Sequence, residues 1–329
     1  MKRFSNILLV ADGDCWAEVP LQRAVALAKH NQARLSIVQT VDLAASVRPA
    51  KDGTYDRLKD SVVDAREKQL RHVLAAAAEE ITLSVRVLPG KVFPEVVREV
   101  LRHDHDLVMK CAQQSGGLRE KIFGSTDMHL LRKCPCPVWI MKPGERKQYR
   151  RILAAVDTED GREQGQAQGL NQQILEMASS LALSEFAELH IVHAWQAWGE
   201  GLLSTPRFSL DEDGEVAAWV EKQRAADEER VNGLLKSLGE IIGRDTMEYL
   251  KPRIHNIKGE AQEVIPDLAE KIGADIVIMG TVARTGIPGL IMGNTAESIL
   301  TGIDCSVLAV KPRGFVSPLT LSGENNETI

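Results

Sequence analysis

The chain repeats one pattern of short apolar segments, in the same order, in its two halves. The matching pairs are Ile7–Asp12 with Ile152–Asp157, Leu35–Gln39 with Leu189–His193, Asp106–Lys110 with Asp275–Met279, and Cys136–Pro143 with Cys305–Pro312. The offset between partners grows from 145 to 154 and then to 169 residues, which indicates two insertions in the second copy. Two copies of about 150 residues predict a tandem duplication of one domain, because solenoid repeats run about 20–50 residues.

Within each copy, apolar strand-like segments alternate with helical patterns. We expect strands at 7–11, 35–41, 83–88, 106–110 and 137–142, and again at 152–156, 189–194, 251–257, 275–279 and 306–310. Helices are expected at 19–29, 56–78, 94–101, 168–182, 215–242, 261–272 and 294–301. The helix at 56–78 has an apolar stripe of Leu58, Val62, Leu70 and Val73. This alternation predicts α/β architecture, two tandem doubly wound domains with ligands at the carboxyl ends of the strands.

Composition sets the boundaries and excludes several classes of protein. We expect domains at 1–143 and 150–313, a polar linker at 144–149 and a mobile tail at 314–329.

A net charge of -6 argues against nucleic-acid or membrane-surface binding, and no apolar stretch is long enough to span a bilayer. The apolar run after Met1 is too short for a signal peptide. Five sparsely spread cysteines are typical of a reducing compartment, so we expect a cytoplasmic protein.

A glycine-rich loop follows the fourth expected strand of the second copy. It begins at Gly280 and reaches Gly293, Asn294 and Thr295 at the start of a helix. Such loops present backbone N–H groups that bind phosphate, although turn glycines and an Asn N-cap give the same pattern. Arg284 would either add charge to a phosphate or lie in solvent.

The corresponding loop of the first copy is degraded. Lys110 and Cys111 end its fourth strand where the second copy has Gly280, Gln114 stands in the place of Ala283, and Gly124-Ser125 remains. Asp12 and Asp157 each end a first strand, where a carboxylate can accept hydrogen bonds from a ribose or an adenine amine, or can cap the following turn.

These motifs resemble the universal stress protein family, and the doubled arrangement resembles its tandem two-domain members. The resemblance rests on the first-strand Asp, a Gly-x2-Gly-x9-Gly-(Ser/Thr) pattern and a last strand ending in Val-x-x-Val-Lys-Pro, and it covers nearly all of residues 4–312. It implies a five-stranded parallel sheet flanked by helices in each domain, Rossmann-like and similar to the adenine nucleotide alpha hydrolases. It also implies ATP binding, and pairing of domains through the last strands. The implied binding residues of the second copy are Asp157, Ala194, Gly280, Ala283, Arg284, Gly293, Asn294 and Thr295.

Two positions depart from the family pattern. Ala283 replaces the second glycine, and a left-handed backbone there would cost about 1 kcal/mol or more. Asn294 stands where Ser or Thr is usual and keeps a hydrogen-bonding side chain. We therefore expect that any nucleotide bound by this chain binds in the second copy, and that the first copy binds no ATP.

Other sites are weaker candidates. His103 and His105 could chelate a metal but more often lie in solvent, and Cys134-Pro-Cys136 lacks the spacing and second pair of a zinc site. The inserted segment 195–209 would form a lid over the second site or cover the neighbouring domain.

No nucleophile or general base stands out, so we expect no enzyme, with slow ATP hydrolysis left open. The expected protein acts in stress response. Its ligand is ATP, with Mg²⁺ only as the nucleotide brings it, or another phosphate-bearing small molecule. Its domains pair within the chain, with a homodimer as a further option, and it has no nucleic-acid or membrane partner. The alternative is a dimerisation scaffold of the same fold that binds no nucleotide.

Overall fold

The computed structural model describes residues 4–13, 15–42, 54–79, 81–113, 122–158, 164–197, 215–282 and 292–321. They form two compact units. The N-terminal unit joins Lys2–Gln148 with Cys305–Ile329 and includes Thr281–Met292, and the C-terminal unit joins Tyr149–Gly280 with Gly293–Asp304. None of the described helices is long and apolar enough to cross a membrane.

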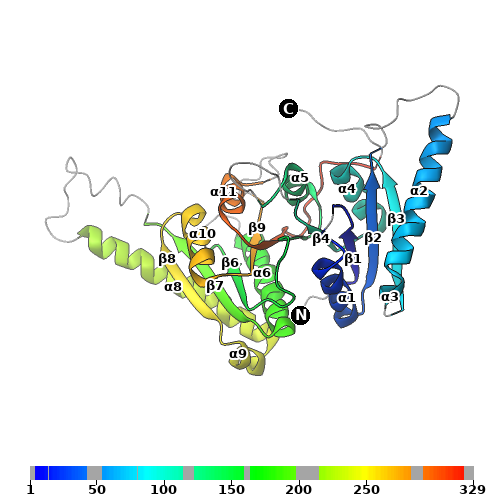
Figure 1. Ribbon diagram of the computed structural model, residues 1–329. Helices are drawn as coiled ribbons and strands as arrows, with labels where there is room; N and C mark the ends of the chain where they lie inside the picture. Colours follow the sequence, from blue (N-terminus) through cyan, green and yellow to red (C-terminus); the bar gives the residue numbers. More distant parts are fainter. Residues whose placement is uncertain are drawn as a thin grey trace. The chain divides into compact units, whose positions relative to one another are not determined.

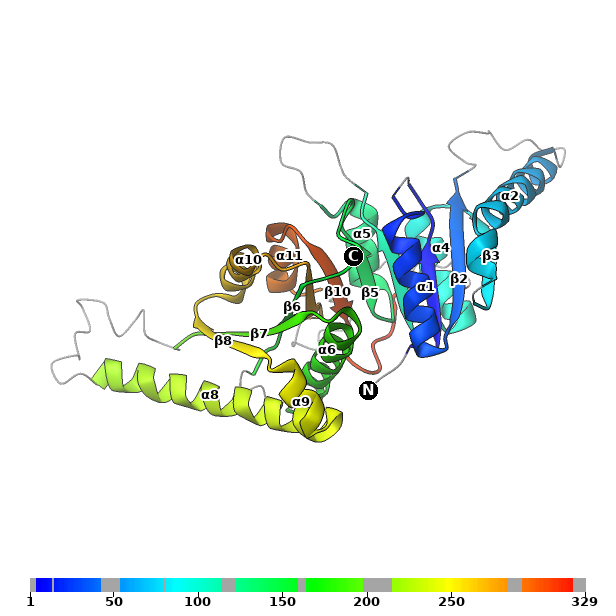
Figure 2. The same cartoon turned by 60° about the horizontal axis from the view of Figure 1, so that its bottom comes forward.

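The N-terminal unit has a parallel sheet in the order β3-β2-β1-β4-β5. The strands are β1 (Asn6–Val10), β2 (Arg34–Val41), β3 (Leu83–Pro89), β4 (Leu107–Cys111) and β5 (Val138–Met141). The helices are α1 (Val19–Asn31), α2 (Thr54–Val73), α3 (Ala75–Ala78), α4 (Val92–His103) and α5 (Ser125–Lys133). Helix α1 lies on one face of this sheet and α4 on the other (Figure 2). Because both faces are covered, β1, β4 and β5 are buried along their whole length, as in other parallel sheets.

The C-terminal unit repeats this arrangement with the strand order β9-β6-β7-β8, again parallel (Figure 1). Its strands are β6 (Arg151–Ala155), β7 (Glu188–Trp195), β8 (Arg253–Lys258) and β9 (Ile276–Gly280). Its helices are α6 (Gln164–Glu185), α8 (Glu215–Ile242), α9 (Arg244–Leu250), α10 (Ala261–Ile272) and α11 (Asn294–Gly302). The α/β fold class and the two repeats predicted from the sequence are confirmed.

The last strand of the second copy pairs with the last strand of the first copy. β10 (Ser306–Val310) belongs to the N-terminal unit, where it runs antiparallel to β5 with Val307 opposite Ile140. The apolar pattern of a fully buried strand is the same beside either neighbour, so it did not identify this partner. The family resemblance implied pairing through the last strands, and the β5–β10 pair agrees with that expectation.

Two other details differ from the expectation. Helix α9 was not predicted. The predicted apolar stripe on α2 was wrong for Leu58 and Val73, whose side chains are 49% and 53% exposed. Leu70 of the stripe is buried, as is Leu74 directly after the helix. Helix α2 packs against the edge strand β3 (Figure 1).

Candidate functional site

The described site residues of the second copy meet at the carboxyl edge of the C-terminal unit's sheet. Asp157 follows β6, Ala194 lies near the end of β7, and Gly280 ends β9. Since β6 pairs in parallel with both β7 and β9, these three chain positions share one edge. Gly293 leads into α11 from the same unit. Ala283 and Arg284 lie outside the described residues.

Asp157 is held through its backbone, and the residue itself is exposed. The side chain of Asn171 on α6 accepts a hydrogen bond from Asp157 N at 3.1 Å and donates one to Asp157 O at 2.6 Å. Asn171 is 5% exposed, so α6 fixes this position firmly. Sequence reasoning missed Asn171, since a polar residue within a helix carries no further signal.

The equivalent carboxylate in the N-terminal unit is closed off. Asp12 is 8% exposed and accepts hydrogen bonds from Thr40 N at 3.1 Å and Thr40 Oγ1 at 3.2 Å. Burial raises the pKa of Asp12, against the opposing effects of Thr40 and the Lys110 charge. Ala194 stands at the corresponding place in β7 and has no hydroxyl to offer to Asp157.

Gly280 lies close to a side chain of helix α6. A Cβ on Gly280 would approach Leu170 Cδ2 of α6 to 2.8 Å, which is closer than real Cβ contacts. The glycine therefore allows α6 to lie against β9, whether or not a ligand also passes there. The strand registers place Cys111 at the equivalent position in β4, so the first copy carries a side chain where the second has none.

The first turn of α11 exposes backbone groups. Gly293 is the N-cap and provides no capping side chain, and Asn294 and Thr295 are exposed. The positive end of the helix dipole and the N–H groups of a first turn favour an anion at such a place.

The matching turn in the N-terminal unit already holds a carboxylate. Asp127 on α5 accepts hydrogen bonds from Gly124 N at 3.1 Å, Gln113 N at 3.3 Å and Lys110 Nζ at 2.8 Å. The side chains of Lys110 and Asp127 are both 0% exposed. Ala296 occupies the position of Asp127 in α11, and the acidic residue of that first turn is Glu297, one position later.

A buried histidine stands next to the candidate site. His193 on β7 has its Nδ1 3.3 Å from Val156 O and its Nε2 2.9 Å from Thr158 Oγ1. Burial lowers the pKa of His193, which keeps the ring neutral near pH 7. Nε2 also lies 3.6 Å from Oδ1 of the buried Asp227 on α8, so the ring contacts the Val156 carbonyl, the Thr158 hydroxyl and the Asp227 carboxylate. The ring thereby ties the chain after β6 to β7.

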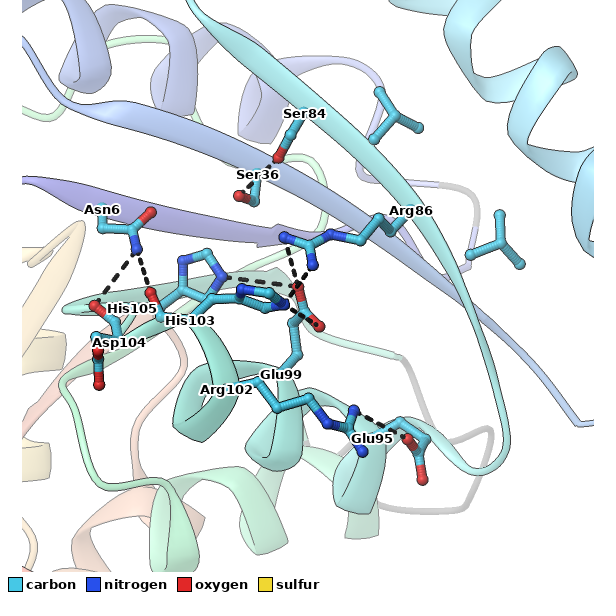
Figure 3. Close-up of polar contacts among 12 residues, drawn as sticks. Asn6, Ser36, Ser84, Arg86, Glu95, Glu99, Arg102, His103, Asp104 and His105 are labelled. Atoms are coloured by element: carbon cyan, nitrogen blue, oxygen red, sulfur yellow. Dashed lines mark hydrogen bonds and ion pairs between the residues drawn. The ribbon is translucent and has the colours of Figure 1, made fainter. Parts of the chain in front are cut away.

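The two histidines considered as metal ligands gather around a carboxylate instead. In the N-terminal unit, His103 and His105 point toward Glu99 of α4, and Arg86 of β3 completes the group (Figure 3). Arg86 NH2 lies 3.1 Å from Glu99 Oε1 and NH1 contacts His103 Nε2, so a guanidinium already occupies the space between the ligands. In the part of the chain that the structure describes, no group of three or more His, Cys, Asp or Glu residues is arranged to hold a metal.

Comparison with known proteins agrees with this fold. The chain matches the universal stress protein family over residues 3–142 and again over 148–311. It is 29% identical to universal stress protein E of Escherichia coli K12, covering 99% of this chain and all of the relative. It is also 29% identical to a universal stress protein E homologue of Haemophilus influenzae, covering 94% of this chain and 98% of that protein.

Solved structures show the same architecture. A putative universal stress protein from Pseudomonas aeruginosa UCBPP-PA14 is 25% identical, with a TM-score of 0.66 over 94% of each chain. A universal stress protein from Archaeoglobus fulgidus DSM 4304 is 18% identical, with a TM-score of 0.61 over 94% of this chain and 97% of the other. At 18% identity, the Archaeoglobus fulgidus structure supports the fold alone.

Proposed function

Because this chain belongs to the universal stress protein family, we propose that it acts in stress response as a cytoplasmic protein whose C-terminal unit binds ATP or another phosphate-bearing ligand. Asp157 and the backbone at Ala194 would hold the adenine and ribose. Gly280, Gly293, Asn294 and Thr295, with Ala283 and Arg284, would hold the phosphates, and Mg²⁺ would enter with the nucleotide. We assign no catalytic step to the chain.

One observation carries this proposal. The N-cap of α11 makes no side-chain hydrogen bond, and Ala296 stands where α5 has a buried carboxylate, with Glu297 one position later. A helix start of this kind can accept a phosphate, whereas the α5 start is already neutralised by Asp127. The exposed Asp157 at the same edge of the sheet supplies a hydrogen-bond acceptor for a sugar or a base amine.

Isothermal titration with Mg·ATP tests the assignment with matched variants. Gly293→Asp adds a negative charge at the α11 start and should abolish binding, while Gly124→Asp at the equivalent place of α5 should leave the affinity unchanged. Tight binding that survives Gly293→Asp would overturn the site. Equal losses in both variants would mean that the two copies bind alike, contrary to the proposal.

The second candidate function is a scaffold that binds no nucleotide. It is favoured by the antiparallel pairing of β5 with β10, which joins the last strands of the two copies within one chain. Since β10 already lies beside β5, a homodimer would use another surface. Mass spectrometry of small molecules released from the purified protein separates the two functions, because a co-purifying nucleotide rejects the scaffold.

A further inference from the structure

A disulfide joins two chain positions at the carboxyl edge of the N-terminal unit's sheet. Cys15 follows β1, Cys111 is the last residue of β4, and their Cα atoms lie 6.1 Å apart. β1 and β4 are parallel neighbours, with Val10 opposite Lys110. The bond therefore ties the chain that leads into α1 to the end of β4, at the edge where sheets of this class bind ligands. From the sequence, the cysteines indicated only a reducing compartment.

The two sulfur-bearing residues differ in exposure. Cys111 is fully buried, whereas Cys15 is only half-buried. Gly13 and Gln113 beside them are both exposed. A thiolate arriving from solvent can thus reach Cys15, while Cys111 is positioned to be the leaving group. Access of this kind governs which disulfides exchange.

The fold does not require the bond. In the C-terminal unit the same strand position is Gly280, which has no side chain to cross-link. A second close pair, Cys134 and Cys136, has its Sγ atoms 3.6 Å apart and remains as thiols in the buried interior. The bridge is therefore particular to the half-exposed pair of the first copy.

We propose that Cys15 and Cys111 form a thiol–disulfide exchange site for small thiols such as glutathione. The thiolate of one glutathione attacks Cys15 Sγ, the bond to Cys111 breaks, and Cys111 leaves with the electron pair and takes a proton. A second glutathione thiolate attacks the mixed disulfide, which frees Cys15 as a thiol and releases glutathione disulfide. One disulfide and two thiols thus become two protein thiols and one glutathione disulfide.

Reduction would change the N-terminal unit locally. It would release the chain before α1 from β4, while the Asp12–Thr40 and Lys110–Asp127 contacts would keep the strand ends in place. The first copy would then contribute a redox-dependent loop in place of a nucleotide site. In the cytoplasm, disulfides of this kind are usually transient.

The full-length protein, equilibrated in glutathione buffers from fully oxidised to fully reduced, tests the exchange. Acid quenching, differential alkylation and peptide mapping report each cysteine. We expect Cys15 and Cys111 to pass together from cross-linked to alkylated, with the labelling of Cys134, Cys136 and Cys305 unchanged. A Cys15–Cys111 disulfide that persists in fully reduced glutathione would be a static cross-link. Free Cys15 and Cys111 thiols in fully oxidised glutathione would mean that the disulfide does not form. Either result overturns the proposal.

Hydrogen exchange of the peptide covering residues 11–18 tests the structural consequence. Exchange should be at least several-fold faster in the reduced wild type than in the oxidised one, and Cys15→Ser should match the reduced wild type under both conditions. Cys305→Ser serves as the matched control and should keep the redox difference. Identical exchange in oxidised and reduced wild type would contradict the proposed loop release.

Discussion

The N-terminal unit closes the carboxyl edge of its sheet with its own side chains, while the C-terminal unit leaves the equivalent positions small or exposed. Asp12 is buried against Thr40, but Asp157 is exposed beside Ala194. Asp127 caps α5 from a buried ion pair, but Ala296 follows the start of α11.

One copy of a duplicated site can be closed without loss of the fold. An internal carboxylate and ammonium satisfy the same backbone groups and the same helix dipole that an external phosphate would satisfy.

Removal of the capping carboxylate should have the largest effect. Asp127→Ala leaves Lys110 charged, buried and without its carboxylate, and should lower the free energy of unfolding by about 3–5 kcal/mol. Urea unfolding followed by circular dichroism measures the loss. The double variant Lys110→Met with Asp127→Ala copies Met279 and Ala296 of the second copy and should recover most of it. A double variant as unstable as Asp127→Ala would mean that the instability does not come from an unpaired Lys110.

Glu99 provides a pH-dependent test in the same unit. Burial alone would raise the pKa of Glu99, but contacts from His105, Arg86 and His103 hold it below its ordinary value of 4.5. The carboxylate therefore contributes stability above pH 4.5, and this contribution is lost as pH falls through the lowered pKa.

The variant Glu99→Gln should cost about 1–3 kcal/mol near pH 7, because Arg86 loses its charged partner. The difference from wild type in urea unfolding should shrink below pH 4.5. As a control, Glu221→Gln alters an exposed pair with Arg224 on α8 and should change stability little at any pH. A Glu99→Gln deficit that stays constant down to pH 3 would contradict the ionic role.

Gly280→Ala tests whether the glycine serves packing. Its Cβ would collide with Leu170, so we expect a loss of about 1–3 kcal/mol in thermal or urea unfolding. Gly169→Ala is the matched control, since nothing lies within 4 Å of a Cβ placed there. We also expect Gly280→Ala to weaken ATP binding. If the double variant Gly280→Ala with Leu170→Ala restores the ATP affinity, the glycine acts through helix packing. If the ATP affinity of the double variant stays low, the glycine also lines the ligand site.

The smallest expected effect is a reciprocal exchange at the end of the second strand of each copy. Thr40→Ala removes a hydroxyl donor to Asp12 and should cost about 1 kcal/mol. Ala194→Thr offers Asp157 the same donor and should weaken ATP binding several-fold in titration calorimetry. An unchanged ATP affinity in Ala194→Thr would indicate that the Asp157 carboxylate does not take part in binding.

Much of the fold followed from local pattern. Helices α8 and α10 begin and end where the apolar periodicity predicted, and the strands were found to within about two residues, because buried parallel strands have continuous apolar runs. Helix α9 was missed, since Arg244–Leu250 is a seven-residue helix with Leu250 as its one buried residue.

The duplication, the α/β class and the edge of the sheet at which the strand-end residues gather follow from the sequence, because they depend on the order and period of apolar residues. The register and antiparallel direction of the β10–β5 pair, the Asn171 hydrogen bonds to Asp157, the Lys110–Asp127 pair and the Cys15–Cys111 bond emerged only from the folded structure. Each of these joins residues far apart in the chain, and such contacts depend on how strands and helices pack, which no local pattern encodes.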